Sequence, residues 1–478
     1  MKDLKDKNSF QQITHFLKPR AIAVVGASSR SGQIGYVILE NLSRAFKGFI
    51  FPVNPTRKSI LGFEVYPSIN AVPKDVDLIV AIIDLKQIPD LIEQSAKKGT
   101  QAVVIVSGGG KELGGEHAEI EAQIFEKAQK YKIRVIGPNC IGVYFPETGI
   151  DTLFQSFERL QRPTVGSISY CSQSGTYGVA FLEFAASNGI GIRSFFSYGN
   201  RLDVDEGDLL AYFAKDRETK LIGLYVEALD NGRKLVELAK NITIRKPIVL
   251  YKAGQTELGA RVAVSHTGWV SQSSPEMNKG MFKQAGIILA KTFHQQCAML
   301  KALYNQPPAR GPNVAFVSNG AGPVVSAIDL IQESPLHLAG LLPESIEELK
   351  EAFPYYFIPV NPVDVTGSAT SRDYETTLHV FLKDPCVHIC MVYCVFQDTP
   401  LDEGIVEVLA NASRAGKSLL VCALGGSYTK SMSKRIEMKG IPVFASIDDW
   451  VAAAEALYLH GKNLDLVNVD IGKISLNP

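Results

Sequence analysis

One histidine stands among residues that suit nucleophilic chemistry. His266 lies in the run AVSHTG, residues 263–268, whose small and hydroxylated side chains leave an imidazole accessible on a loop. A neutral imidazole is nucleophilic at neutral pH, and an acceptor such as a carboxylate fixes its second ring nitrogen as the N–H tautomer. Most loop histidines have no catalytic role, so this interpretation depends on the surroundings. The other seven histidines lack a Gly-rich partner segment, and we assign them no chemistry.

A Ser- and Gly-rich turn offers a place for an anion. Ser172, Ser174, Gly175 and Thr176 follow the apolar run VGSISYC and lead into a predicted helix. The N–H groups and the dipole at such a helix start favour a phosphate, by up to ~2 kcal/mol. Glu227 closes another apolar run, TKLIGLYVEA, at the sheet edge where ligands of α/β proteins bind. Histidine, carboxylate and turn together form a nucleophile, an orienting group and an anion cradle.

A second Gly-rich turn follows the apolar run AIAVV. It reads GASSRSGQIG over residues 26–35 and leads into a predicted helix, so its N–H groups also suit a phosphate. The spacing is not GxGxxG, and the next strand ends in Asn54, where a dinucleotide site needs Asp or Glu for the ribose. Arg57 and Lys58 follow and can meet a further phosphate. A pyrophosphate ligand other than NAD is indicated; the alternative is a turn that serves packing alone.

The elements that position these residues form three successive α/β series. A chain of 478 residues exceeds one core and fits about three units of ~150 residues. Apolar runs alternate with amphipathic segments, which indicates parallel sheets with crossover helices. We expect domains at 8–145, 146–304 and 311–470, with a helical stretch at 274–304 and a breaker-rich linker before the third.

Composition excludes several classes of protein. Lys+Arg and Asp+Glu are balanced at 49 each, so no net field attracts nucleic acid or an anionic membrane. The first residues are polar and charged, and no apolar window reaches the ~18 residues of a spanning helix. We expect a cytoplasmic protein without a nucleic-acid or membrane partner.

Three of the seven cysteines lie close together but do not predict a cluster site. Cys386, Cys390 and Cys394 fall in PCVHICMVYCVF, a run rich in strand-forming residues, and their spacing matches no iron–sulfur pattern. A buried strand with His388, Cys390, Val392 and Cys394 on one face is the better interpretation. We expect reduced thiols and no metal site.

The motifs resemble the α subunits of succinyl-CoA synthetase and, more closely, of the ADP-forming acetyl-CoA (acyl-CoA) synthetases. The resemblance runs over nearly the whole chain and implies a Rossmann-like CoA-binding domain followed by two flavodoxin-like domains. It rests on these runs: VVGASSRSGQIG, PVNP, ILGFEVYPSI, SGGGKE, VIGPNCIG, SQSGTYG, YGNRLDVDEGDLL, GLYVEA, AVSHTG, SNGAGP and NPVDVTG.

The resemblance also implies roles for single residues. His266 is the phosphorylated histidine, Glu227 is the carboxylate that orients it, and Ser172, Ser174, Gly175 and Thr176 hold the phosphate. Gly26, Ser28, Ser29 and Arg30 surround the CoA phosphates, whereas Ser107, Asn139 and Cys140 lie along the pantetheine arm. The predicted CoA-binding set is completed by Gly32, Gln33, Asn54, Pro55, Arg57 and Gly108.

The implied reaction is acyl-CoA + phosphate + ADP ⇌ carboxylic acid + CoA + ATP. Fused relatives carry an ATP-grasp domain after the third domain, whereas this chain ends at Pro478 and has no Walker A sequence. We therefore expect an ATP-grasp β subunit that holds ADP or ATP with Mg, in an α2β2-like assembly. The resemblance also implies a second histidine on that subunit.

Departures from the family pattern leave alternatives open. Trp269 follows the SHTG run where relatives usually have a small residue, and it either reshapes the acyl pocket or packs the loop base. SGGGKE replaces the more usual SAGFxE. A non-catalytic CoA-sensing or scaffold protein is the alternative function. An NAD-dependent oxidoreductase is disfavoured by Asn54 and by the glycine spacing.

Overall fold

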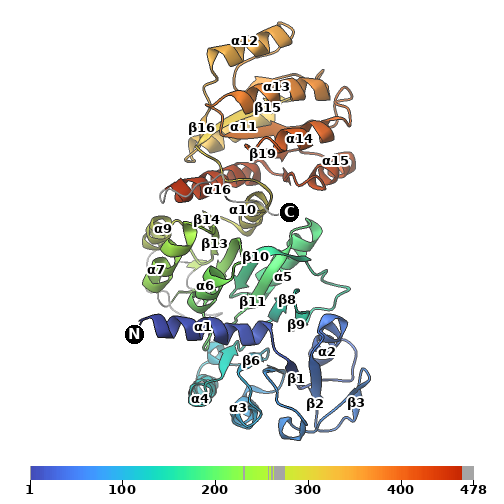
Figure 1. Ribbon diagram of the computed structural model, residues 1–478, viewed down its shortest axis with the longest axis vertical. Coiled ribbons are helices and arrows are strands. Elements are labelled where there is room, and N and C mark those ends of the chain that lie inside the picture. Colours follow the sequence, from blue (N-terminus) through green and yellow to red (C-terminus); the bar gives the residue numbers. More distant parts are fainter. Residues whose placement is uncertain (1, 230–231, 257, 260–261, 263–274, 466–478) are drawn as a thin grey trace. The chain divides into compact units, whose positions relative to one another are not determined.

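A computed structural model describes residues 2–229, 232–256, 258–259, 262 and 275–465 (Figure 1). The chain separates into two compact units, one of Met1–Ile242 with Leu250–Ala285 and one of Thr243–Val249 with Gly286–Pro478. Within the described residues the strands form three larger sheets and one two-stranded sheet, β3 (Ser59–Ile60) with β4 (Phe63–Glu64). The α/β class is confirmed, and the three-domain boundaries stay a prediction.

The first sheet is fully parallel, with the strand order β2-β1-β5-β6-β7. Its strands are short apolar runs separated by helices, as the alternating pattern predicted, and nearly all their side chains are buried because helices cover a parallel sheet. The elements are β1 Ala21–Val25, β2 Phe49–Val53, β5 Leu78–Ala81, β6 Ala102–Ile105, β7 Arg134–Ile136, α1 Lys2–Leu17, α2 Ile34–Ala45, α3 Ile88–Ala96 and α4 Glu116–Tyr131.

The second sheet has seven strands in the order β14-β13-β12-β10-β11-β8-β9. β10 lies parallel to β11 and β12, whereas β8 runs antiparallel to β11. β8 precedes the expected domain boundary at residue 146 yet pairs in this sheet. The elements are β8 Gly142–Phe145, β9 Ile150–Asp151, β10 Val165–Ser172, β11 Ile192–Ser197, β12 Leu221–Val226, β13 Ile248–Lys252, β14 Ile288–Ala290, α5 Gly175–Ser187, α6 Glu206–Lys215, α7 Gly232–Thr243, α9 Pro275–Gln284 and α10 Phe293–Asn305.

The predicted helical stretch at 274–304 is wrong in its middle. Helix α9 ends at Gln284, and Gly286 takes a positive φ of 70°, which stops a helix readily because glycine has no Cβ. The apolar residues that follow form the short strand β14 before α10 begins.

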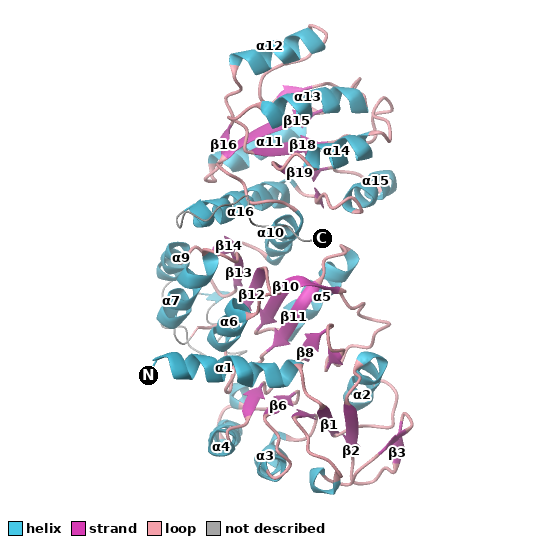
Figure 2. Cartoon of the chain, viewed as in Figure 1, coloured by secondary structure: helices cyan, strands magenta, loops and turns pink. Residues whose placement is uncertain are grey.

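The third sheet has six strands, with the order β16-β15-β18-β19-β20 and β17 paired to β15. Figure 2 shows β15, β16, β18 and β19 of this sheet together with helices α11 to α16. Its neighbouring strands pair in parallel among the described residues, and helices accompany the strands along the chain. The elements are β15 Asn313–Ser318, β16 His337–Leu338, β17 Val363–Asp364, β18 Ile389–Tyr393, β19 Ser418–Cys422, β20 Val443–Phe444, α11 Ala321–Gln332, α12 Pro343–Ala352, α13 Ser371–Lys383, α14 Ile405–Ser413, α15 Ser427–Glu437 and α16 Ile447–Asp465.

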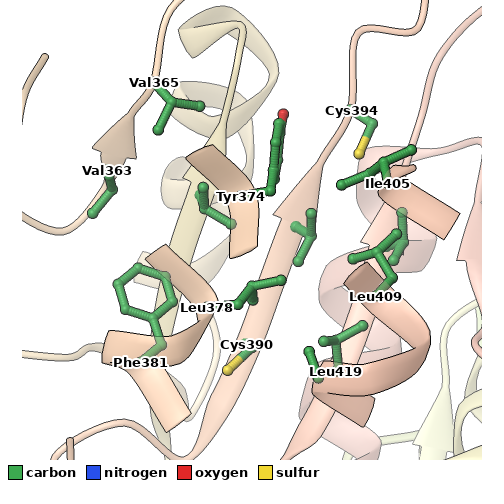
Figure 3. Packing of buried hydrophobic residues seen from close by; sticks show 14 of the residues in the cluster. Val363, Val365, Tyr374, Leu378, Phe381, Cys390, Cys394, Ile405, Leu409 and Leu419 are labelled. Atoms are coloured by element: carbon green, nitrogen blue, oxygen red, sulfur yellow. The ribbon is translucent and has the colours of Figure 1, made fainter. Parts of the chain in front are cut away.

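The cysteine-rich run is a buried strand, as predicted. Cys390, Val392 and Cys394 belong to one hydrophobic cluster, and Figure 3 shows both sulfurs among apolar side chains such as Leu378 and Ile405. Burial raises the pKa of both thiols to about 12, so they stay protonated at neutral pH. Over the residues that the structure describes, no group of His, Cys, Asp and Glu can hold a metal ion. None of the helices so described is long and apolar enough to span a membrane.

His460 makes the second unit sensitive to acid. Its side chain is buried in α16, its Nδ1 has no hydrogen-bond partner among the described residues, and burial lowers its pKa from 6.5 to about 4. The unfolded chain therefore binds this proton first as the pH falls. We therefore expect the free energy of unfolding to fall by up to ~3 kcal/mol between pH 6.5 and 4, at ~1.4 kcal/mol per pKa unit.

We expect His460→Leu to flatten this pH dependence. Urea unfolding followed by the fluorescence of buried Trp450, in a Trp269→Phe background, isolates the signal of the second unit. His379→Gln, at an exposed position of α13, is the control and should change the free energy of unfolding little. Equal slopes between pH 6.5 and 5 in the parent and in His460→Leu would contradict the assignment.

Candidate functional site

Glu227 directly follows β12, at the carboxyl end of the second sheet. Its side chain is half-buried, and its Oε1 accepts a hydrogen bond from the Tyr225 hydroxyl at 3.2 Å. Its main-chain N–H donates to Gln173 Oε1 at 2.8 Å, and its carbonyl accepts from Lys252 Nζ at 2.6 Å. The main chain that carries the carboxylate is thus held by two side chains from neighbouring segments.

The predicted anion turn lies beside Glu227. Ser172 is the last residue of β10 and pairs in register with Tyr225 of β12, two residues before Glu227. Ser174 caps α5 in an extended conformation, and its side chain makes no capping hydrogen bond. The first N–H groups of a helix have no acceptor within the helix, so those of Gly175 and Thr176 suit a phosphate oxygen. The structure therefore brings the carboxylate and the turn together.

Two residues of this site were missed from the sequence. Gln173 stands inside the SQSG turn and Lys252 ends the apolar run of β13, and both side chains are buried. Burial lowers the pKa of Lys252 from 10.5 to about 8, although the nearby Glu227 opposes the shift. A lysine that follows four strand residues is easily taken for an exposed strand end. The one feature of the sequence that could have indicated a buried Lys252 is its position at the end of an otherwise apolar run.

The first Gly-rich turn is built by close packing of its backbone. Gly26 has φ +94°, and a Cβ on Gly35 would lie 2.3 Å from the Gly26 carbonyl oxygen, so α2 can approach the turn only through a glycine. Ser28 Oγ accepts from Arg30 N at 3.1 Å. The side chains from Ser29 to Gln33 are exposed, which leaves this surface open to a ligand.

Asn54 ties the end of β2 to this turn. Its Nδ2 donates to the Ala27 carbonyl at 2.9 Å, and its Oδ1 accepts from Thr56 N at 2.9 Å. The amide thus connects two segments where a dinucleotide site needs a carboxylate. Pro55 and Arg57 are exposed beyond it.

The predicted pantetheine residues lie on two adjoining loops. Asn139 N donates to the Ser107 carbonyl at 2.8 Å, and a Cβ on Gly108 would lie 3.4 Å from Asn139 Oδ1. The Cys140 thiol is buried, donates to the Ile105 carbonyl, and has its pKa raised to about 12 by burial. Its side chain therefore does not act as a thiolate.

The two loops meet the anion turn within the first unit. A Cβ on Gly175 would lie 2.5 Å from Ile141 Cγ2, so the start of α5 packs directly against the residue after Cys140. Tyr198 N donates to the Ser172 carbonyl, and Asn200 N donates to the Pro138 carbonyl. The loop that carries Asn139 therefore lies against the turn at the start of α5. His266 and Trp269 lie outside the described residues, and the roles of all the predicted site residues stay predictions.

Comparisons with known proteins agree on a family. The chain matches the models described as CoA binding domain, over residues 20–146, and Succinyl-CoA ligase like flavodoxin domain, over residues 165–303. It is 34% identical over 458 residues to the acetate–CoA ligase (ADP-forming) II subunit alpha of Pyrococcus furiosus, covering 95% of this chain and 98% of that one. The corresponding I subunit alpha is 35% identical over 456 residues.

A solved structure extends the similarity to three dimensions. The dinucleotide forming acetyl-coenzyme A synthetase 1 of Ca. Korarchaeum cryptofilum, in complex with phosphate and ADP, superposes with a TM-score of 0.87 at 32% identity. The match covers 95% of this chain and 98% of that one. These relatives are ligases, which disfavours the CoA-sensing scaffold considered above.

We expect Gly35→Ala to weaken CoA binding at least tenfold. The added Cβ forces the turn at Gly26 away from α2, and the N–H groups of the turn move with it. Calorimetric titration with CoA gives the affinity, and circular dichroism checks the fold. Ser31→Ala, an exposed change in the same turn, is the control. Unchanged affinity in Gly35→Ala would show that CoA binds elsewhere.

Proposed function

Because the chain belongs to the family of the ADP-forming acetate–CoA ligase alpha subunits, we propose that it is the phosphohistidine-carrying subunit of an acyl-CoA synthetase. It binds CoA on the first sheet and forms or uses a thioester by way of an acyl phosphate. The observation that supports this most directly is the placement of Glu227 beside the Ser172–Thr176 turn, through the register of β10 and β12.

In the direction of ATP formation, the reaction has three transfers. A phosphate oxygen attacks the thioester carbonyl, the C–S bond breaks, and CoA leaves. An imidazole nitrogen of His266 then attacks the phosphorus, the P–O bond breaks, and the carboxylate leaves. Finally a terminal oxygen of ADP attacks the phosphohistidine, the N–P bond breaks, and ATP forms.

Each described residue has a task in this scheme. The N–H groups of Gly175 and Thr176 bind phosphoryl oxygens at the start of α5. Glu227 accepts a hydrogen bond from the imidazole N–H, which leaves the other nitrogen with a lone pair for attack. The Tyr225 hydroxyl fixes Glu227 Oε1 and limits its rotation.

The nucleotide belongs to a second polypeptide in this proposal. An ATP-grasp β subunit holds ADP or ATP, and Mg²⁺ there neutralises charge on the nucleotide phosphates. The relatives named as alpha subunits support such a partner. We place the assembly in the cytoplasm, with an α2β2-like composition.

We expect the isolated chain to make no ATP from acyl-CoA, phosphate and ADP, and an added ATP-grasp subunit to restore turnover. A coupled luminescence assay measures ATP in both mixtures. Robust ATP formation by the chain alone would place a nucleotide site within it and refute the need for a partner.

We expect the complex, incubated with labelled ATP, to gain an acid-labile, base-stable phosphoryl label on this chain. His266→Asn should abolish the label and turnover, because asparagine has no nucleophilic ring nitrogen. Glu227→Gln should keep the fold and reduce the labelling rate at least tenfold, because an amide supports the charged ring less well than a carboxylate.

His294→Asn, at an exposed position of α10, is the matched control and should label at the parent rate. Undiminished labelling of the His266→Asn chain would refute the role of His266 as the phosphorylated residue. The non-catalytic CoA-sensing or scaffold protein would then be the favoured function.

A further inference from the structure

The turn that follows β10 in the first unit has a counterpart in the turn that follows β15 in the second unit. The two turns differ in how the residue beside them on the neighbouring strand is held. In the second unit Ser318 ends β15 and pairs with Tyr393, just as Ser172 ends β10 and pairs with Tyr225. The residue two positions further on is Val395 in one case and Glu227 in the other. Asn319 corresponds to Gln173, because each follows the serine of its turn.

The side-chain amides of Asn319 and Gln173 make different hydrogen bonds to the main chain beside them. Asn319 satisfies both main-chain groups of Val395: its Oδ1 accepts from Val395 N at 2.8 Å and its Nδ2 donates to the Val395 carbonyl at 3.1 Å. Gln173 Oε1 accepts from the N–H groups of Glu227 and Ala228, at 2.8 and 3.1 Å. Gln173 Nε2 is buried and has no hydrogen-bond partner among the described residues.

The carbonyl of Glu227 accepts a hydrogen bond from Lys252 and not from the amide of Gln173. Lys252 Nζ donates to the carbonyls of Glu227 and Ala253, and the lysine is only 6% exposed. Burying an ammonium costs several kcal/mol, and leaving a buried amide donor unsatisfied costs about 1–3 kcal/mol. The cost of the buried ammonium falls at the turn beside Glu227, whereas the amide of Asn319 binds both main-chain groups of Val395 and also donates to Asp398 Oδ2 at 3.1 Å.

We propose that Lys252 is a positioning residue of the phosphoryl-transfer site, which fixes the main chain of Glu227 from its carbonyl side while Gln173 holds the amide side. This inference rests on the proposed function. The two side chains together set the direction of the carboxylate toward the Ser172–Thr176 turn. The ammonium also brings a positive charge close to the turn where a phosphate would add negative charge. An amide could bind the Glu227 carbonyl but could not offset that negative charge.

Lys252→Met tests the proposal, because methionine is apolar and of similar length. In the complex with the ATP-grasp subunit, we expect kcat to fall at least tenfold and KM for CoA to stay within twofold, since no CoA-binding loop is touched. Lys252→Arg keeps the charge and should recover part of kcat.

A double-mutant cycle separates positioning from a general effect on the fold. If Lys252 acts through Glu227, Lys252→Met should change the residual rate less than twofold in a Glu227→Gln background. The same tenfold loss in both backgrounds would overturn the proposal. If Lys252→Met does not fold, Lys252→Leu, which also removes the charge and the donor to the carbonyl, enters the same cycle with the same expectations.

Asn319→Leu is the matched control, because it removes the corresponding amide beside Val395. Provided that it folds, it should leave the labelling rate of the first unit unchanged. A parent complex without acid-labile label would refute the proposed function itself, whereas a labelled parent without coupling between Lys252 and Glu227 would refute only the role of Lys252.

Discussion

The parallel register between β10 and β12 is the constraint on which the site depends. Ser172 opposes Tyr225, so the turn that follows β10 and the carboxylate that follows β12 emerge at one edge of the sheet. Side chains alternate between the faces of a strand, and a shift of one residue would turn Glu227 to the opposite face. The buried apolar residues of both strands hold this register, because a shift would disrupt their close packing against the residues that cover each face. Hydrophobic patterning therefore fixes the position of a polar site.

Close backbone contacts through glycine connect the site to the first sheet. Gly175 meets Ile141, and a Cβ on Gly199 would lie 2.3 Å from the carbonyl oxygens of Pro138 and Asn139. Because these glycines have no side chain, the neighbouring segments can come into direct contact with their backbone. This contact brings the predicted pantetheine loop to the start of α5.

The sequence predicted the fold better than the electrostatics of the site. Apolar runs located the strands of the first sheet and the longer strands of the other two, since burial on both faces gives a parallel strand a continuous apolar signal. The short strands β8, β9, β14, β16 and β17 were not predicted, because two to four residues carry too little periodicity. Glu227 and the Ser172–Thr176 turn could be predicted as site residues because strand ends and glycine turns are visible locally, and their roles stay predictions. Lys252 was not, because its role depends on a contact with a main-chain carbonyl of another strand.

Charge balance explains why such a lysine belongs at this edge. A phosphoryl group bound at the start of α5 brings negative charge toward the carboxylate of Glu227. Two like charges 4 Å apart repel by about 4 kcal/mol at an effective dielectric constant of 20. The dipole of α5 offsets part of this repulsion, but it is worth at most ~2 kcal/mol. A buried ammonium on the carbonyl side of Glu227 supplies a further opposite charge without occupying the place of the phosphate. In the second unit Val395 stands in place of Glu227, and there an uncharged amide binds both main-chain groups and also donates to Asp398.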